Sequence, residues 1–172
     1  MIIDEATVAD IPALLRLING AYRGDGSRRG WTTEADLLGG QRTDADDLLT
    51  RLQTPGAVIL TLREADSLDL LGCVYLEPQR ESLYLGMLTV RPDRQAAGLG
   101  RQLLAAAEAH ARQLDLPAVK MTVITARAEL LAWYERHGYR RTGRVLPFPD
   151  DPRFGLPRQV LAMEVLRKEL GG

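Results

Sequence analysis

The chain has 172 residues and a formal net charge of −1, so it generates no overall field that would attract nucleic acid or an anionic membrane surface. Its two histidines and one cysteine make a metal site built from His and Cys unexpected. A chain of this length can bury a sizeable core, and we expect residues 1–172 to form one domain.

Nothing in the sequence predicts secretion or membrane insertion. Residues 1–5 contain two acidic side chains and do not resemble a signal peptide, and no apolar run approaches the ~18 residues that span a bilayer. Cys73 lies in an apolar run, which favours a buried thiol in a reducing compartment over a nucleophile. We therefore expect a cytoplasmic protein that binds neither membrane nor nucleic acid.

The N-terminal part of the chain predicts one short strand and three helices. Residues 1–6 are expected to form the strand, and the apolar spacing after Pro12 predicts a helix from 11 to about 22. Thr33 with Asp36 predicts a short capped helix, and residues 43–53 predict another. Trp31 and Glu34 belong either to a substrate pocket or, for Trp31, to an anchor that holds an irregular loop on the core.

A series of strands follows. Runs rich in Val, Ile, Leu and Thr predict antiparallel strands at 57–63, 70–76 and 83–90, joined by a hairpin loop and a turn. A long amphipathic helix from Leu99 leads to a strand at 118–124, which we expect to be parallel to 83–90. A helix at 126–137 ends at Gly138, and strands follow at 139–145 and 159–166. This order predicts an α/β (α+β) fold with a mixed, mostly antiparallel twisted sheet and helices on both faces.

The loop between the strand at 83–90 and the long helix is the most informative stretch. Small side chains lead to Gly98 and Gly100, where the helix begins. The unpaired N–H groups of a helix N-terminus and the positive end of its dipole favour an anion such as a pyrophosphate. The loop is not a Walker A sequence, and Leu103 stands where a dinucleotide fingerprint has its third glycine. A close-packed turn without a ligand is the alternative.

Gln95-x-x-Gly98-x-Gly100, preceded by Val-x-Pro and followed by Leu-Leu, resembles the acetyl-CoA-binding motif of the GCN5-related N-acetyltransferase (GNAT) family. Most of the chain can be laid on that family's order of elements. The resemblance implies that backbone N–H groups of the loop hold the pyrophosphate of acetyl-CoA, and that the preceding strand pairs with the pantetheine arm. The residues so implied are Leu88, Thr89, Val90, Gln95, Ala96, Ala97, Gly98, Leu99 and Gly100. Arg94 and Arg101 either add charge there or are solvated.

The resemblance also implies where the chemistry takes place. The strands at 83–90 and 118–124 part in this family, and a backbone N–H near Leu88 meets the thioester oxygen. Residues 132–139 resemble the family's second motif, Ala-x-x-Phe-Tyr-Glu-x-x-Gly-Phe, in which Tyr134 matches the tyrosine that protonates the CoA thiolate. A packed helix tyrosine is the alternative for Tyr134.

Two positions depart from the family. Arg127 stands where relatives often have an asparagine that contacts the cofactor, so that contact is in doubt, although Arg127 could reach a phosphate instead. Tyr84 stands where some relatives carry a catalytic carboxylate. The general base is therefore open between three residues, each of which is also compatible with plain surface: Glu34, Glu77 and Glu81.

We expect an N-acetyltransferase that moves an acetyl group from acetyl-CoA to a primary amine of a small molecule or a peptide by direct attack, without a metal. The alternatives are a catalytically silent module that binds or senses acyl-CoA and an unrelated nucleotide-binding α/β protein. The resemblance also suggests a homodimer. The segments expected to contact the acceptor, 23–42 and 147–158, carry acidic and basic residues alike and do not name the acceptor.

Overall fold

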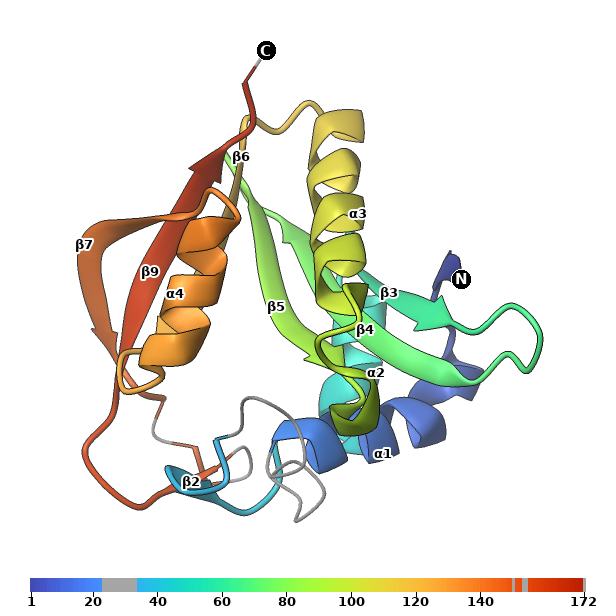
Figure 1. The fold of residues 1–172 in the computed structure, drawn as a ribbon, viewed down its shortest axis with the longest axis horizontal. Coiled ribbons are helices and arrows are strands. Elements are labelled where there is room, and N and C mark those ends of the chain that lie inside the picture. Colours follow the sequence, from blue (N-terminus) through green and yellow to red (C-terminus); the bar gives the residue numbers. More distant parts are fainter. Residues whose placement is uncertain (23–33, 150, 153–154, 172) are drawn as a thin grey trace.

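A mixed seven-stranded sheet runs through the computed structural model, which describes residues 1–22, 34–149, 151–152 and 155–171 (Figure 1). The strand order is β1-β3-β4-β5-β6-β9-β7, and all neighbours are antiparallel except β5 and β6. The strands are β1 (Ile2–Glu5), β3 (Val58–Arg63), β4 (Leu70–Pro78), β5 (Leu83–Val90), β6 (Ala118–Ile124), β7 (Arg140–Pro147) and β9 (Ala162–Glu169). The mostly antiparallel mixed sheet is therefore confirmed.

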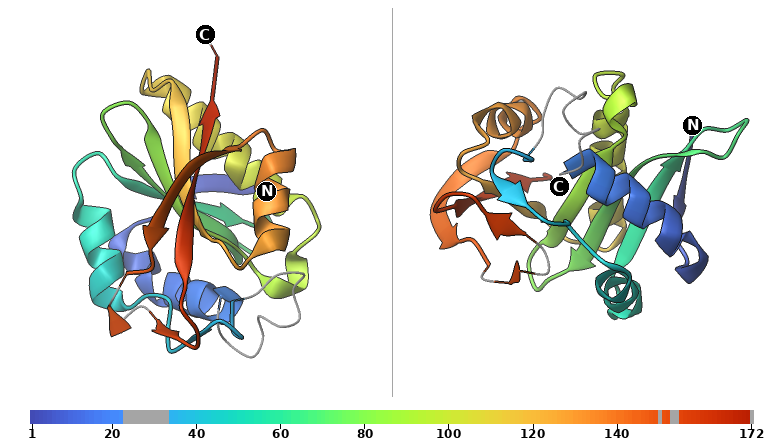
Figure 2. Two further views of the ribbon diagram at one scale, coloured as in Figure 1. Left: turned by 90° about the vertical axis from the view of Figure 1, so that its left-hand side faces the viewer. Right: turned by 90° about the horizontal axis from the view of Figure 1, so that it is seen from below.

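Helices cover both faces of this sheet, as the sequence predicts (Figures 1 and 2). Two helices, α1 (Ile11–Tyr22) and α2 (Ala45–Gln53), pack on one face around Ile59, Tyr75 and Met87. The other face carries α3 (Leu99–Gln113) and α4 (Ala128–Arg136), which share a larger apolar core with β4, β5 and β6. None of the helices in the described part of the chain has the length and apolar character needed to cross a membrane.

The segment after residue 33 differs from the prediction. Thr33, the expected helix cap, lies outside the described residues, as does Trp31. The N–H groups of Leu37 and Leu38 both donate to the carbonyl of Glu34, which closes a single turn and no helix. The chain then extends into β2 (Leu38–Gly39), which pairs with β8 (Leu156–Pro157). Strands of two residues have no periodicity, so the sequence pattern could not indicate this second sheet.

The parallel pair β5 and β6 separates along its length. Paired positions are confined to Leu83 with Val119 and Tyr84 with Lys120. Beyond them β6 continues its ladder with β9, while β5 continues with β4, and the two strands diverge (Figure 1). The parting of these strands, which the family resemblance implied, is therefore present, and within the described residues it leaves part of one edge of β5 without a strand neighbour.

A bulge interrupts β5 where it diverges. Met87 and Leu88 together face the single residue Val74 of β4, and Met87 adopts a φ of +50°. The buried hydroxyl of Thr89 donates to the Met87 carbonyl at 2.8 Å, which holds the bulge in place. One extra residue reverses the alternation of a strand. Met87 consequently packs with α1, whereas Leu88 turns to the α3 side.

Candidate active site

The loop between β5 and α3 has an unusual backbone. A short 3-10 helix (Pro92–Arg94) follows β5. The side-chain amide of Gln95 donates to the Val90 carbonyl at 3.2 Å, and this bond connects the loop to the end of the strand. Ala96 and Gly98 then adopt left-handed conformations, with φ of +67° and +78°. Left-handed residues in such turns form concave sites in which N–H groups can surround an anion.

The N–H groups of this loop are available for a ligand. The first helical hydrogen bond of α3 runs from Gln102 to the Gly98 carbonyl at 3.1 Å. In the part of the chain that the structure describes, no group accepts a hydrogen bond from the backbone N–H groups of residues 96–101. The positive end of the α3 dipole lies behind them. The loop therefore presents a row of unbonded donors that suits a pyrophosphate.

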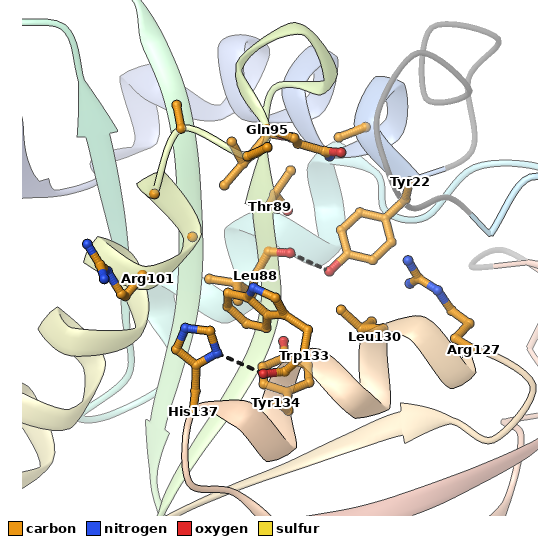
Figure 3. Close-up of a pocket in the computed structure, with 16 residues that line it drawn as sticks. Tyr22, Leu88, Thr89, Gln95, Arg101, Arg127, Leu130, Trp133, Tyr134 and His137 are labelled. Carbon is orange, nitrogen blue, oxygen red and sulfur yellow. Dashed lines mark hydrogen bonds between the residues drawn. The ribbon is translucent and has the colours of Figure 1, made fainter.

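A cavity of about 520 Å³ lies between this loop, the divergent half of β5 and helix α4 (Figure 3). Trp133 closes one side, and its ring lies next to Gly100, where a Cβ would be in ordinary contact with the ring at 3.4 Å. Of the residues predicted to bind the cofactor, all except Leu99 line the cavity; they are Leu88, Thr89, Val90, Gln95, Ala96, Ala97, Gly98, Gly100, Arg101, Arg127 and Tyr134. The side chain of Leu99 is buried in the α3 core instead.

A second cavity of about 250 Å³ lies on the far side of the gap between β5 and β6. Residues of α2, β5 and β6 line it together with residues 148, 149 and 151, and Arg51, Tyr84 and Asp151 are among them. The two cavities have five lining residues in common: Tyr22, Leu88, Arg127, Leu130 and Tyr134. They therefore adjoin at the point where β5 bulges and leaves β6.

Tyr134 lies at this junction. Its ring packs edge-on against Trp133 and Tyr139, with centroids 5.0 and 5.8 Å away. Its hydroxyl forms no hydrogen bond with the residues described here, and it lines both cavities. Burial raises the pKa of Tyr134 well above its usual range. The phenol is consequently protonated at neutral pH, as a proton donor must be.

Glu34 and Arg127 form a buried ion pair beside Tyr134. The guanidinium lies 3.4 Å from the Glu34 carboxylate, and the two side chains are 7% and 4% exposed. Arg127 also lies 3.8 Å from Glu129. Figure 3 shows Arg127 and Arg101 on opposite sides of the first cavity, and Arg101 belongs to the first turn of α3.

The three candidate bases, Glu34, Glu77 and Glu81, differ in whether they line a cavity. Glu34 lines the second cavity, whereas Glu77 and Glu81 line neither cavity. Glu77 accepts a hydrogen bond from the Tyr75 hydroxyl at 2.8 Å, and Glu81 is exposed in the turn between β4 and β5. Trp31, the proposed companion of Glu34, lies outside the described residues.

Sequence reasoning missed Tyr22. This last residue of α1 donates its hydroxyl to the Leu88 carbonyl at 2.7 Å, and burial raises its pKa to about 12. Figure 3 shows this bond at the centre of the site. A terminal helix tyrosine carries no local signal of such a role, because its partner is 66 positions away in sequence. His137, which follows α4, also lines the first cavity, with Nδ1 2.7 Å from the Trp133 carbonyl oxygen.

No group of three or more His, Cys, Asp or Glu side chains that could hold a metal ion occurs among the residues placed in the structure. The sequence model of the family described as "Acetyltransferase (GNAT) domain" matches residues 41–148 of this chain. The comparison with curated protein sequences gave no match.

Solved structures share the fold at low sequence identity. Ribosomal-protein-alanine N-acetyltransferase from Brucella melitensis superposes with a TM-score of 0.72 at 22% identity, covering 98% of this chain and 99% of that one. The yncA protein of Salmonella typhimurium, solved with its cofactor acetyl-CoA, superposes with a TM-score of 0.70 at 20% identity, covering 100% of this chain and 95% of that one. An N-acetyltransferase from Staphylococcus aureus superposes with a TM-score of 0.69 at 14% identity, covering 99% of this chain and 98% of that one.

Proposed function

This chain belongs to the GNAT acetyltransferase family, and we propose that it transfers the acetyl group of acetyl-CoA directly to the primary amine of a small molecule. The observation that carries the proposal is the junction of the two cavities. One cavity has amides that donate to no group of the described residues and suit a pyrophosphate. The other opens between β5 and β6, and a buried phenol lies where the two adjoin.

The first cavity fits acetyl-CoA on the donor groups present. The backbone N–H groups of residues 96–101 would hold the pyrophosphate, with Arg101 adding positive charge. Ala96 and Ala97 are exposed and small, which permits close approach of phosphate oxygens to the backbone. The edge of β5 that lacks a strand neighbour would pair with the pantetheine amides as an added strand does.

When bound, acetyl-CoA supplies a thioester whose carbonyl carbon forms a bond to the amine nitrogen while the C–S bond breaks. Leu88, in the bulge, would offer its N–H to the thioester oxygen as negative charge develops there. Tyr134 would give its proton to the departing sulfur, since a buried phenol is protonated at neutral pH. The nitrogen would in turn lose a proton to a base, so the charges balance.

Glu34 is the carboxylate that we assign to this last role. It lines the second cavity, and Arg127 holds it within reach of the junction. Because the pair is buried, a water molecule between the amine and the carboxylate is the simplest route for the proton. No covalent acyl-enzyme is needed, and positioning together with oxyanion stabilisation would provide most of the rate.

The proposal is tested by titration calorimetry with acetyl-CoA and by thiol release across a panel of primary amines. We expect binding of acetyl-CoA and release of CoA thiol with at least one amine. Tyr134→Phe should retain acetyl-CoA binding and lose most of the turnover, whereas Tyr75→Phe, which removes a hydroxyl outside both cavities, serves as the matched control.

Two other results would each replace the proposal. Tight binding of acetyl-CoA without thiol release from any amine would favour a sensing module. Protection from heat by ATP or NAD, with none from acetyl-CoA, would favour an unrelated nucleotide-binding protein.

A further inference from the structure

The second cavity contains a cationic side chain that no carboxylate of the described residues neutralises. Of the described residues that line this cavity, three are arginines. Arg51 pairs with Asp47 at 3.0 Å, and Arg127 pairs with Glu34. Arg42 differs, because no carboxylate within the described part of the chain lies at ion-pair distance from its guanidinium. Its charge is therefore available to a ligand in the cavity.

The position of Arg42 is fixed by its backbone. Asn19 of α1 accepts hydrogen bonds from the N–H groups of Arg42 and Thr43 at 2.7 and 3.0 Å, and it donates to the Thr43 carbonyl at 3.0 Å. The guanidinium carbon lies 5.5 Å from the centre of the Tyr22 ring, within cation–π range. Arg42 is half-buried, so water screens its charge less than at an open surface.

A second donor lies in the same cavity. The Tyr84 ring packs over Gly86, where a Cβ would lie 3.0 Å from the ring and 3.2 Å from the hydroxyl oxygen. Within the described residues, this hydroxyl has no hydrogen-bond partner. Among the described residues, the Arg42 guanidinium has no carboxylate partner and the Tyr84 phenol has no hydrogen-bond partner. Such donors suit a ligand rich in acceptor oxygens, since guanidinium groups bind carboxylate and related oxyanions in bidentate fashion.

The same cavity also contains the carboxylate of Glu34, which is paired with Arg127, and the carboxylate of Asp151. A ligand that carries both an ammonium and an oxyanion would match this mixture of charges. The volume of about 250 Å³ suits a molecule of a few heavy atoms better than a folded protein chain.

We propose that the acceptor is a small amine that also carries an oxyanion, with a free amino acid as the simplest case, and that Arg42 binds the oxyanion. This inference rests on the proposed acetyl transfer and adds the chemical class of the acceptor. Arg42 would hold the oxyanion, and the amine of the same molecule would lie toward Tyr134 and the junction.

The test uses the full-length protein and matched pairs of compounds. The twenty standard amino acids are compared with their carboxamides in a thiol-release assay with acetyl-CoA, and the accepted or best-bound pair is titrated by NMR in the presence of CoA. Taurine and 2-aminoethylphosphonate distinguish sulfonate and phosphonate from carboxylate. We expect kcat/KM for the acid to exceed that for its amide by about 10- to 100-fold, the range for a charge-assisted hydrogen bond.

Substitution of Arg42 gives the second arm. Arg42→Gln should weaken binding of the acid by about 10-fold or more and reduce the difference between acid and amide. The hydrogen bonds from Asn19 involve the backbone of residues 42 and 43, so they are retained in this variant. The matched control is Arg16→Gln, which removes an exposed arginine of α1 outside both cavities.

The outcomes separate this inference from the proposed function. Turnover of amides or uncharged amines as fast as acids would overturn the assignment of Arg42 and leave acetyl transfer standing. Acids that bind through Arg42 without any thiol release would support the binding site and overturn the transfer. Failure of every acid, sulfonate and phosphonate to bind would overturn the inference whatever the turnover of other amines.

Discussion

Replacement of Gly72 by alanine tests the packing behind the cofactor edge of β5. A Cβ at Gly72 would lie 2.7 Å from the Thr89 carbonyl oxygen and 2.9 Å from the Leu103 side chain, whereas ordinary contact begins at 3.4 Å. The backbone of β5 would have to retreat by about 0.7 Å, and overpacking of this kind costs about 1–3 kcal/mol. Because Thr89 and Val90 line the first cavity, we also expect weaker binding of acetyl-CoA.

Gly20 supplies the matched control. It lies within α1, and a Cβ there would meet no atom within 4 Å. Gly20→Ala should raise the free energy of unfolding by about 0.5–1 kcal/mol, because alanine favours the helix. For both variants, urea denaturation measures the free energy of unfolding and titration calorimetry measures the Kd of acetyl-CoA. If Gly72→Ala were as stable as the wild type and bound acetyl-CoA equally well, the argued contact between β4 and β5 would be refuted.

Three further predictions concern the site itself. Tyr134→Phe should lower kcat with little change in the Kd of acetyl-CoA, and since burial raises the pKa of Tyr134, the wild-type kcat should show no descending limb below about pH 10; a fall between pH 8 and 9 would contradict the acid role. Tyr22→Phe removes the hydrogen bond to the Leu88 carbonyl and should lower the free energy of unfolding by about 1 kcal/mol in urea melts, together with a several-fold loss of kcat; an unchanged kcat would show that this bond does not position the bulge for catalysis. Ala96→Gly relieves a left-handed alanine and should stabilise the protein by up to about 1 kcal/mol in thermal melts, whereas a loss of stability would argue against the φ of +67°.

The order of the elements could be predicted because each element carries its own local signal. Leu99, Leu103, Leu104, Ala107 and Ala111 recur with helical spacing, and all five are buried on one face of α3. Runs of β-branched and aliphatic residues between turns predict the three strands from Val58 to Val90. Apolar spacing and strand propensity can both be read within a few consecutive residues, because the backbone preference that causes them is local.

The departures come from interactions between distant segments. In β5 the residues Leu83, Leu85 and Met87 read as one buried face, yet the bulge sends Met87 to the opposite core. The bulge depends on pairing with β4 and on the Thr89 hydroxyl, neither of which a sequence pattern contains. Arg127 pairs with Glu34, which is 93 positions away, and a family motif read along the sequence contains no signal of this ion pair.

The candidate site arises where two irregularities of the sheet coincide. Separation of β5 from β6 leaves a strand edge open, and the bulge turns Leu88 toward that opening. An amine in the second cavity and a thioester in the first can meet only along the walls that both cavities share. A change at Arg42, in the second cavity, should therefore alter acceptor binding alone. Changes in the loop between β5 and α3, as at Gly98, should alter acetyl-CoA binding alone. Changes at Tyr134, which lines both cavities, should reduce the chemical step itself.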